Sequence, residues 1–134
     1  MKKVLLLVAV VTLALFSFKN VKKSQQTPES KIIGTWFYEK STTSKLVFDT
    51  SGRLSAYYNG DKLRYSGNYS ISHSCGSNSD TNFYFLKVVY DDGDEICYEI
   101  NGINENNSGI LSLTSMKNGK VSLFVNDPNI QIPD

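Results

Sequence analysis

The chain has 134 residues, enough for one domain of ordinary size. It carries 14 Lys and Arg side chains against 13 Asp and Glu, a formal net charge of +1, and 40% of its residues are hydrophobic. This balance leaves no basic stripe of the kind that nucleic-acid phosphates require, so no nucleic-acid partner is expected.

The N-terminal residues 1–19 differ from the rest of the chain. Two lysines precede an apolar run over residues 4–18. A helix of that length reaches about 22 Å, short of the ~30 Å hydrocarbon core of a membrane. Residues 1–19 therefore predict a signal peptide and export to the periplasm or the extracellular space. Lysines at positions 19, 22 and 23 leave an uncleaved N-terminal anchor as the alternative, which would be the chain's one contact with a membrane.

Residues 20–31 are polar, contain Pro28 and show no periodicity, so we expect a linker. The folded domain is expected over residues 32–126, followed by a tail of residues 127–134. Without residues 1–19 the chain keeps 11 basic and 13 acidic side chains, a net charge of about −2.

From residue 33 to residue 125, apolar and polar side chains alternate with a period of two, the pattern of half-buried β-strands. Turn residues divide this stretch into eight predicted strands. They cover residues 33–39, 44–49, 53–58, 61–72, 82–90, 94–101, 109–116 and 120–126.

Four turns predict how neighbouring strands pair. Residues 49–53, 90–94 and 116–120 each fit a three-residue loop with glycine last, and Asn59-Gly60 is a strong type I′ signal. Each turn places apolar residues opposite one another. The predicted pairs are Asp49–Arg53, Phe48–Leu54, Leu46–Ala56, Tyr58–Asp61, Ala56–Leu63, Leu54–Tyr65, Val88–Ile96, Leu86–Tyr98, Tyr84–Ile100, Leu113–Leu123 and Leu111–Val125.

Eight antiparallel strands leave two exposed edges unless the sheet closes. The fold class predicted is therefore all-β, an eight-stranded antiparallel up-and-down meander barrel. A two-sheet β-sandwich is the alternative.

The side chains predicted to point into the barrel include no charged residue and seven of the eight tyrosines. They are Trp36, Tyr38, Leu46, Phe48, Leu54, Ala56, Tyr58, Leu63, Tyr65, Tyr69, Ile71, Tyr84, Leu86, Val88, Tyr90, Ile96, Tyr98, Ile100, Leu111, Leu113, Val121, Leu123 and Val125.

Tyrosine has an apolar body and one polar tip, which suits a ligand cavity with a few placed polar groups. The predicted contacts of a small apolar or aromatic ligand are Tyr58, Tyr65, Tyr69, Tyr84 and Tyr98. An eight-stranded barrel is also narrow enough for side chains to fill it, so a filled core is the competing interpretation.

The predicted strand 82–90 is apolar on both faces, because Phe83, Phe85 and Val89 point away from the barrel interior. A strand of this kind is usually covered on both sides. The cover is expected to be the loop that carries Cys75, the C-terminal tail, or a protein partner.

Cys75 and Cys97 are the two cysteines, and in an exported domain the expected arrangement is one disulfide. It would stabilise the fold by roughly 3 kcal/mol. Two unpaired thiols are the alternative, and only then could His73 activate Cys75 as a nucleophile. With no other catalytic motif, no enzyme activity and no cofactor are expected. The acidic residues 91–95 lack the spacing of a calcium loop, so no metal site is expected.

Several short motifs occur in a fixed order along the predicted strands. They are Gly34-Thr35-Trp36, Leu46-x-Phe48-x-x-x-Gly52, Gly67-x-Tyr69-x-Ile71, Gly93 to Ile100, and Leu111-Ser112-Leu113. Over residues 33–125 the sequence resembles the bacterial lipocalin-like domain family of small exported proteins and lipoproteins. The resemblance implies an eight-stranded barrel, a ligand cavity by analogy, and a structural role for Trp36 across the closed end of the barrel.

Two functions follow as hypotheses. The first is an exported binding module that holds a small hydrophobic or aromatic ligand in the barrel. The second is a filled-core domain without a small-molecule ligand, which contacts a protein partner through Phe83, Phe85 and Val89 or serves as an envelope-structural element.

Overall fold

The computed structural model describes residues 25–133. The predicted signal peptide, residues 1–19, lies outside this range. Within it the chain forms one short α-helix, α2 (Pro28–Ile32), one 3₁₀ helix, η1 (Glu105–Asn107), and ten strands. The strands are β1 (Gly34–Tyr38), β2 (Ser41–Phe48), β3 (Arg53–Tyr58), β4 (Lys62–Ser72), β5 (Ser74–Cys75), β6 (Asn78–Ser79), β7 (Tyr84–Tyr90), β8 (Glu95–Ile103), β9 (Ile110–Ser115) and β10 (Val121–Val125).

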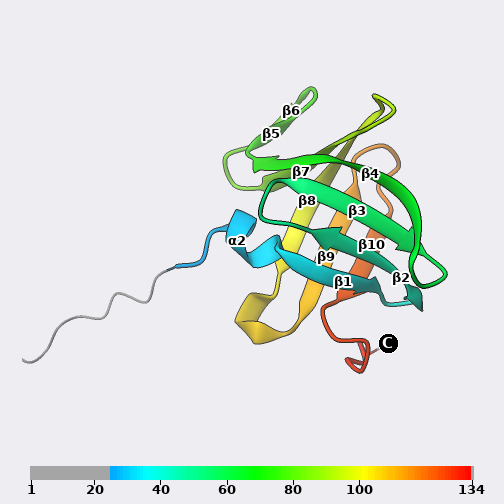
Figure 1. Ribbon diagram of the computed structural model, residues 1–134. Helices are drawn as coiled ribbons and strands as arrows, with labels where there is room; N and C mark the ends of the chain where they lie inside the picture. Colours follow the sequence, from blue (N-terminus) through cyan, green and yellow to red (C-terminus); the bar gives the residue numbers. More distant parts are fainter. Residues whose placement is uncertain (1–24, 134) are drawn as a thin grey trace, which may run out of the picture.

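Eight of these strands close into one antiparallel barrel in the order β1-β10-β9-β8-β7-β4-β3-β2 (Figure 1). The predicted all-β meander barrel is confirmed, and the sandwich alternative is wrong. Closure pairs β1 with β10, so neither end of the sheet remains an open edge. No helix within residues 25–133 is both long and apolar enough to cross a membrane.

Two hairpins have the register that their turns predict. Phe48 pairs with Leu54, and the Asp49 amide donates to the Arg53 carbonyl at 2.9 Å. Between β7 and β8, Leu86 pairs with Tyr98 as predicted. In both loops the last residue is a glycine with positive φ, which the three-residue turn requires.

The Asn59-Gly60 hairpin differs from its prediction. Tyr58 pairs with Lys62 instead of Asp61, and a β-bulge follows, so Ala56 pairs with Tyr65 and Tyr57 with Leu63. Arg64 is the extra residue of this bulge. A bulge changes the direction of side chains on the bulged strand, and Leu63, predicted to point inward, is 56% exposed.

The last hairpin is shifted by one residue. Ser115 bonds to Lys120 across a four-residue loop, because the Met116 amide bonds instead to the Cys97 carbonyl of β8. The shift reverses the faces of β10, and Leu111 therefore pairs with Phe124 instead of Val125. Phe124 packs against the core, whereas Val121, predicted to point inward, is 54% exposed.

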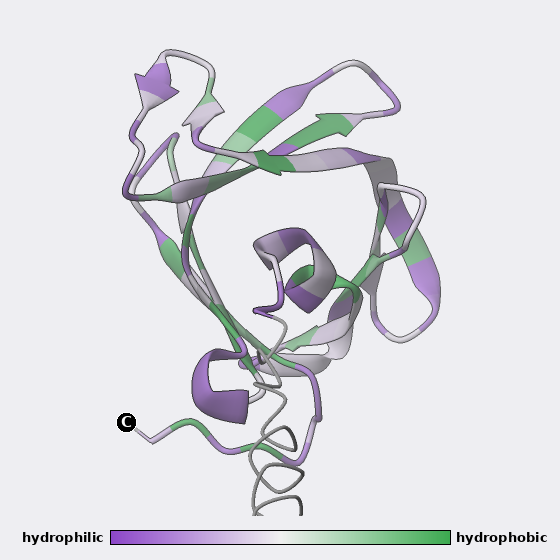
Figure 2. Cartoon of the chain, turned by 90° about the vertical axis from the view of Figure 1, so that its left-hand side faces the viewer, coloured by the Kyte–Doolittle hydropathy of each residue, from purple (hydrophilic) through white to green (hydrophobic). Residues whose placement is uncertain are grey.

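Helix α2 closes one end of the barrel and corrects the prediction that residues 20–31 are only a linker. Thr27 caps the helix, and Pro28 occupies its first turn. Figure 2 shows α2 inside the ring of strands. Ile32 is fully buried in the core cluster, and its carbonyl accepts a 2.7 Å hydrogen bond from Nε1 of Trp36, itself 2% exposed.

The predicted disulfide joins Cys75 to Cys97 and holds the β5–β6 hairpin against the barrel. Cys75 and Phe85 are both 3% exposed, and β5 contacts β7. The hairpin therefore covers Phe85, which is not available to a protein partner. The tail lies elsewhere, with Ile130 against Gly109.

Outside the barrel, Asp91 joins three strands. Its carboxylate accepts two hydrogen bonds from Arg53, at 2.8 and 2.7 Å, and a third from the Ser66 hydroxyl. These hydrogen bonds, the one from Arg53 first, hold the pKa of Asp91 well below its usual range. The loop between β7 and β8 is thus fastened to β3 and β4.

We predict that Ile32→Ala lowers the free energy of unfolding by about 2–5 kcal/mol, because it leaves a cavity in the core beneath α2. Urea unfolding followed by the fluorescence of the single tryptophan measures this change. The matched control is Ile33→Ala, since Ile33 is 41% exposed and should lose less than about 1 kcal/mol. Equal losses in the two variants would show that α2 does not belong to the cooperative core.

We also predict that the stabilising effect of Asp91 depends on pH. Its pKa is lower in the folded protein than in the unfolded chain, so its stabilisation is present above about pH 4 and decreases as the pH falls further. The urea midpoint of Asp91→Asn should therefore lie below that of the wild type at about pH 7 and approach it at about pH 2. Asp94→Asn, in the same loop, is the control. A difference between wild type and Asp91→Asn that stays constant over this range contradicts the prediction.

Candidate ligand-binding cavity

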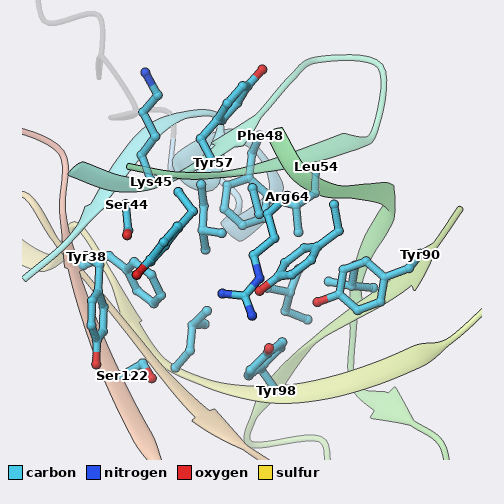
Figure 3. A pocket seen from close by; sticks show the side chains of 18 of the residues that line it. Tyr38, Ser44, Lys45, Phe48, Leu54, Tyr57, Arg64, Tyr90, Tyr98 and Ser122 are labelled. Carbon is cyan, nitrogen blue, oxygen red and sulfur yellow. The ribbon is translucent and has the colours of Figure 1, made fainter. Parts of the chain in front are cut away.

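A cavity of about 410 Å³ lies at the end of the barrel opposite α2 (Figure 3). Its walls come from all eight barrel strands and from the loop that precedes β10. The lining residues are Tyr38, Ser44, Lys45, Leu46, Phe48, Leu54, Ala56, Tyr57, Tyr58, Arg64, Tyr65, Leu86, Val88, Tyr90, Tyr98, Leu113, Lys120, Ser122 and Phe124.

The floor of the cavity is apolar and tightly packed. Phe48, Leu86 and Val88 are each at most 1% exposed and belong to the same core cluster as Trp36 and Ile32. The half of the barrel next to α2 is thus filled by side chains, and the space lies in the other half.

The middle of the cavity carries tyrosine hydroxyls above the apolar floor. Tyr90 and Tyr98 are half-buried, and burial raises the pKa of both phenols. Tyr90 also contacts the ring of Tyr65 edge-on, with 5.2 Å between the ring centroids. At neutral pH these phenols keep their protons and can donate hydrogen bonds.

The mouth of the cavity is formed by exposed aromatic rings and by Arg64. Tyr58 is 48% exposed and Tyr65 42%, although both line the cavity. The Arg64 guanidinium carbon lies 5.7 Å from the centroid of the Tyr58 ring and 5.3 Å from that of the Tyr65 ring. Both distances are typical of cation–π contacts.

Of the five tyrosines predicted to contact a ligand, Tyr58, Tyr65 and Tyr98 line this cavity. Tyr69 does not, because its ring packs edge-on behind Phe48 and its hydroxyl donates to the Asp49 carbonyl at 2.9 Å.

The fifth tyrosine, Tyr84, lies at the α2 end. It borders a more open hollow of about 690 Å³ beside α2 and β8, whose lining is mostly polar. Phe83, 45% exposed, borders the same hollow. His73 stacks on Tyr84 with 4.3 Å between ring centroids, and its Nδ1 lies 2.7 Å from the Phe83 carbonyl. Since Cys75 is in the disulfide, His73 has no thiol there to activate.

Seven residues that line the cavity were not among the side chains predicted to point inward. They are Ser44, Lys45, Tyr57, Arg64, Lys120, Ser122 and Phe124. Tyr57 borders the cavity, but its side chain points away from it, in line with its assignment to the outer face (Figure 3). Arg64 contradicts the prediction that no charge points inward. Arg64 is the extra residue of the bulge between β3 and β4, which no turn signal in the sequence marks. Within residues 25–133 the acidic hairpin loop forms no metal-binding cluster of three or more His, Cys, Asp or Glu side chains.

Neither a family model, nor a curated protein, nor a solved structure matches the chain. The function is therefore inferred from the cavity itself.

Proposed function

We propose that the protein is an exported, lipocalin-like binding module that holds a small hydrophobic or aromatic molecule in the cavity opposite α2. The observation that carries this proposal is the cavity of about 410 Å³ in the open half of the barrel. Pockets for small ligands usually enclose about 300–1,000 Å³, so this cavity suits a ligand at the lower end of the range.

The chemistry of the lining supports the same proposal. The floor around Leu86 and Val88 is apolar, whereas hydroxyl groups and Arg64 lie nearer the mouth. Binding sites for small molecules combine a mostly apolar wall with a few polar groups that orient the ligand. A domain that needs only a filled core would gain nothing from the open half, because a void forfeits packing contacts.

Export and the lipocalin-like assignment rest on separate support. The disulfide between Cys75 and Cys97 fits an oxidising compartment outside the cytoplasm. Trp36 of the Gly34-Thr35-Trp36 motif is buried beside the helix that closes one barrel end, as the resemblance implies. A barrel alone does not establish function, so binding must be measured directly.

We expect the neutral fluorescent probe N-phenyl-1-naphthylamine to bind with one-to-one stoichiometry and increased emission. Ala56→Phe should abolish binding, because Ala56 lines the cavity and is 5% exposed, so a phenyl ring there occupies the space of the ligand.

The matched control is Ser55→Phe, on the other face of the same strand, which should bind the probe like the wild type. Thermal unfolding of each variant checks that the barrel is folded. If the wild type does not bind the probe, or if folded Ala56→Phe binds it unchanged, the filled-core function replaces this proposal.

A further inference from the structure

Arg64 enters the cavity because of the bulge in β4. On a regular strand it would point away from the interior, since its neighbour Tyr65 pairs with the inward-facing Ala56. Arg64 has no partner on β3, and Figure 3 shows its guanidinium group inside the cavity, in the same space as the hydroxyls of Tyr90 and Tyr98. Bulges are common next to functional sites, where they redirect a side chain.

The guanidinium of Arg64 has no acidic partner within residues 25–133. The ion pairs there use Lys31, Lys45, Arg53 and Lys87 as cations. Within residues 25–133 the Arg64 side chain also donates no hydrogen bond, and it contacts the rings of Tyr58 and Tyr65. Its five N–H donors are therefore free to meet a ligand.

The cavity lining and the domain as a whole carry net charges of opposite sign. Residues 25–133 contain nine basic and twelve acidic side chains. The charged residues that line the cavity are nevertheless all cations, namely Lys45, Arg64 and Lys120. Lys45 is neutralised by Asp61 at 2.9 Å, and its ammonium points away from the cavity (Figure 3). Lys120 makes no ion pair within residues 25–133 either, but it is exposed in the loop before β10. Arg64 is thus the unpaired cation whose charged group lies inside the cavity (Figure 3).

These observations together specify the polar end of a ligand. An arginine fork matches the two oxygens of a carboxylate, and a protonated phenol is a further donor to an anion. Tyr90 and Tyr98 are such phenols. A dianionic phosphate would call for further unpaired cations inside the cavity. Arg64 supplies the guanidinium there (Figure 3), whereas Lys120, the other unpaired cation of the lining, lies in the exposed loop before β10.

Resting on the proposed function, we infer that the ligand is a small amphipathic monocarboxylate. Its apolar body occupies the space above Leu86 and Val88, and its carboxylate meets Arg64 between the rings of Tyr58 and Tyr65. Binding therefore requires both parts of the molecule, the apolar body for the floor and the anion for the mouth.

The test compares decanoate with decanol, which has the same chain and no charge, by competition against bound N-phenyl-1-naphthylamine. Decanoate is used below its micellar concentration. We expect wild-type protein to bind decanoate about tenfold more tightly than decanol. Arg64→Gln should weaken decanoate binding about tenfold and leave decanol unchanged, because a hydrogen-bonded charge is lost and the apolar floor stays intact.

Lys62→Gln is the matched control, an exposed cation on the same strand that does not line the cavity. It should leave both affinities unchanged. Equal binding of decanoate and decanol by the wild type overturns the inference, as does an equal loss for both ligands in folded Arg64→Gln. The inference also fails if Lys62→Gln weakens decanoate as much as Arg64→Gln, since general attraction would then suffice.

The failure of the inference and that of the proposed function give different results. If the probe binds but neither chain compound displaces it, the cavity takes another ligand and only the monocarboxylate inference is wrong. If the probe and both chain compounds fail to bind, the proposed function is wrong and the inference falls with it.

Discussion

The hydrogen bond from Trp36 Nε1 to the Ile32 carbonyl is the contact that holds α2 in one end of the barrel and leaves the other end for the cavity. An indole N–H and a helix-terminal carbonyl both need partners when buried, and here each satisfies the other at 2.7 Å. The bond holds α2 inside the ring of strands, with Ile32 fully buried. Because the core is filled at this end, the cavity of about 410 Å³ lies at the opposite end of the barrel, with its floor on the core cluster.

The two ends of the barrel are built from different kinds of residue. At the α2 end, aliphatic and aromatic side chains interlock and exclude water, which stabilises the fold. At the other end, tyrosines and Arg64 form a mouth that is partly exposed and holds a free cation. Stability and binding are therefore served by separate halves of one small domain. The disulfide and the Arg53–Asp91 ion pair link elements on the outer surface of the barrel and leave the mouth of the cavity free.

The site was partly predictable, because alternation identifies faces better than it identifies register. Tyr65 and Tyr98 were assigned to the interior correctly, since the bulge shifts the pairing of Tyr65 without moving it to the other face. Tyr69 and Tyr84 also follow the alternation, but their height along the barrel axis keeps them out of the cavity. Height depends on the stagger of the strands, which a single sequence does not encode locally.

The sequence by itself determined the all-β meander and two of its four hairpin registers, because turn chemistry and period-two alternation are local properties. It also determined the pairing of Cys75 with Cys97, because these are its two cysteines. Only the tertiary structure decided that residues 28–32 close the barrel, that β10 turns Phe124 inward, and that Arg64 enters the cavity. Each of these three features depends on contacts with segments that are distant in the sequence. Ile32 needs the barrel end, Met116 takes the Cys97 carbonyl, and the bulge exists only once β3 and β4 are paired.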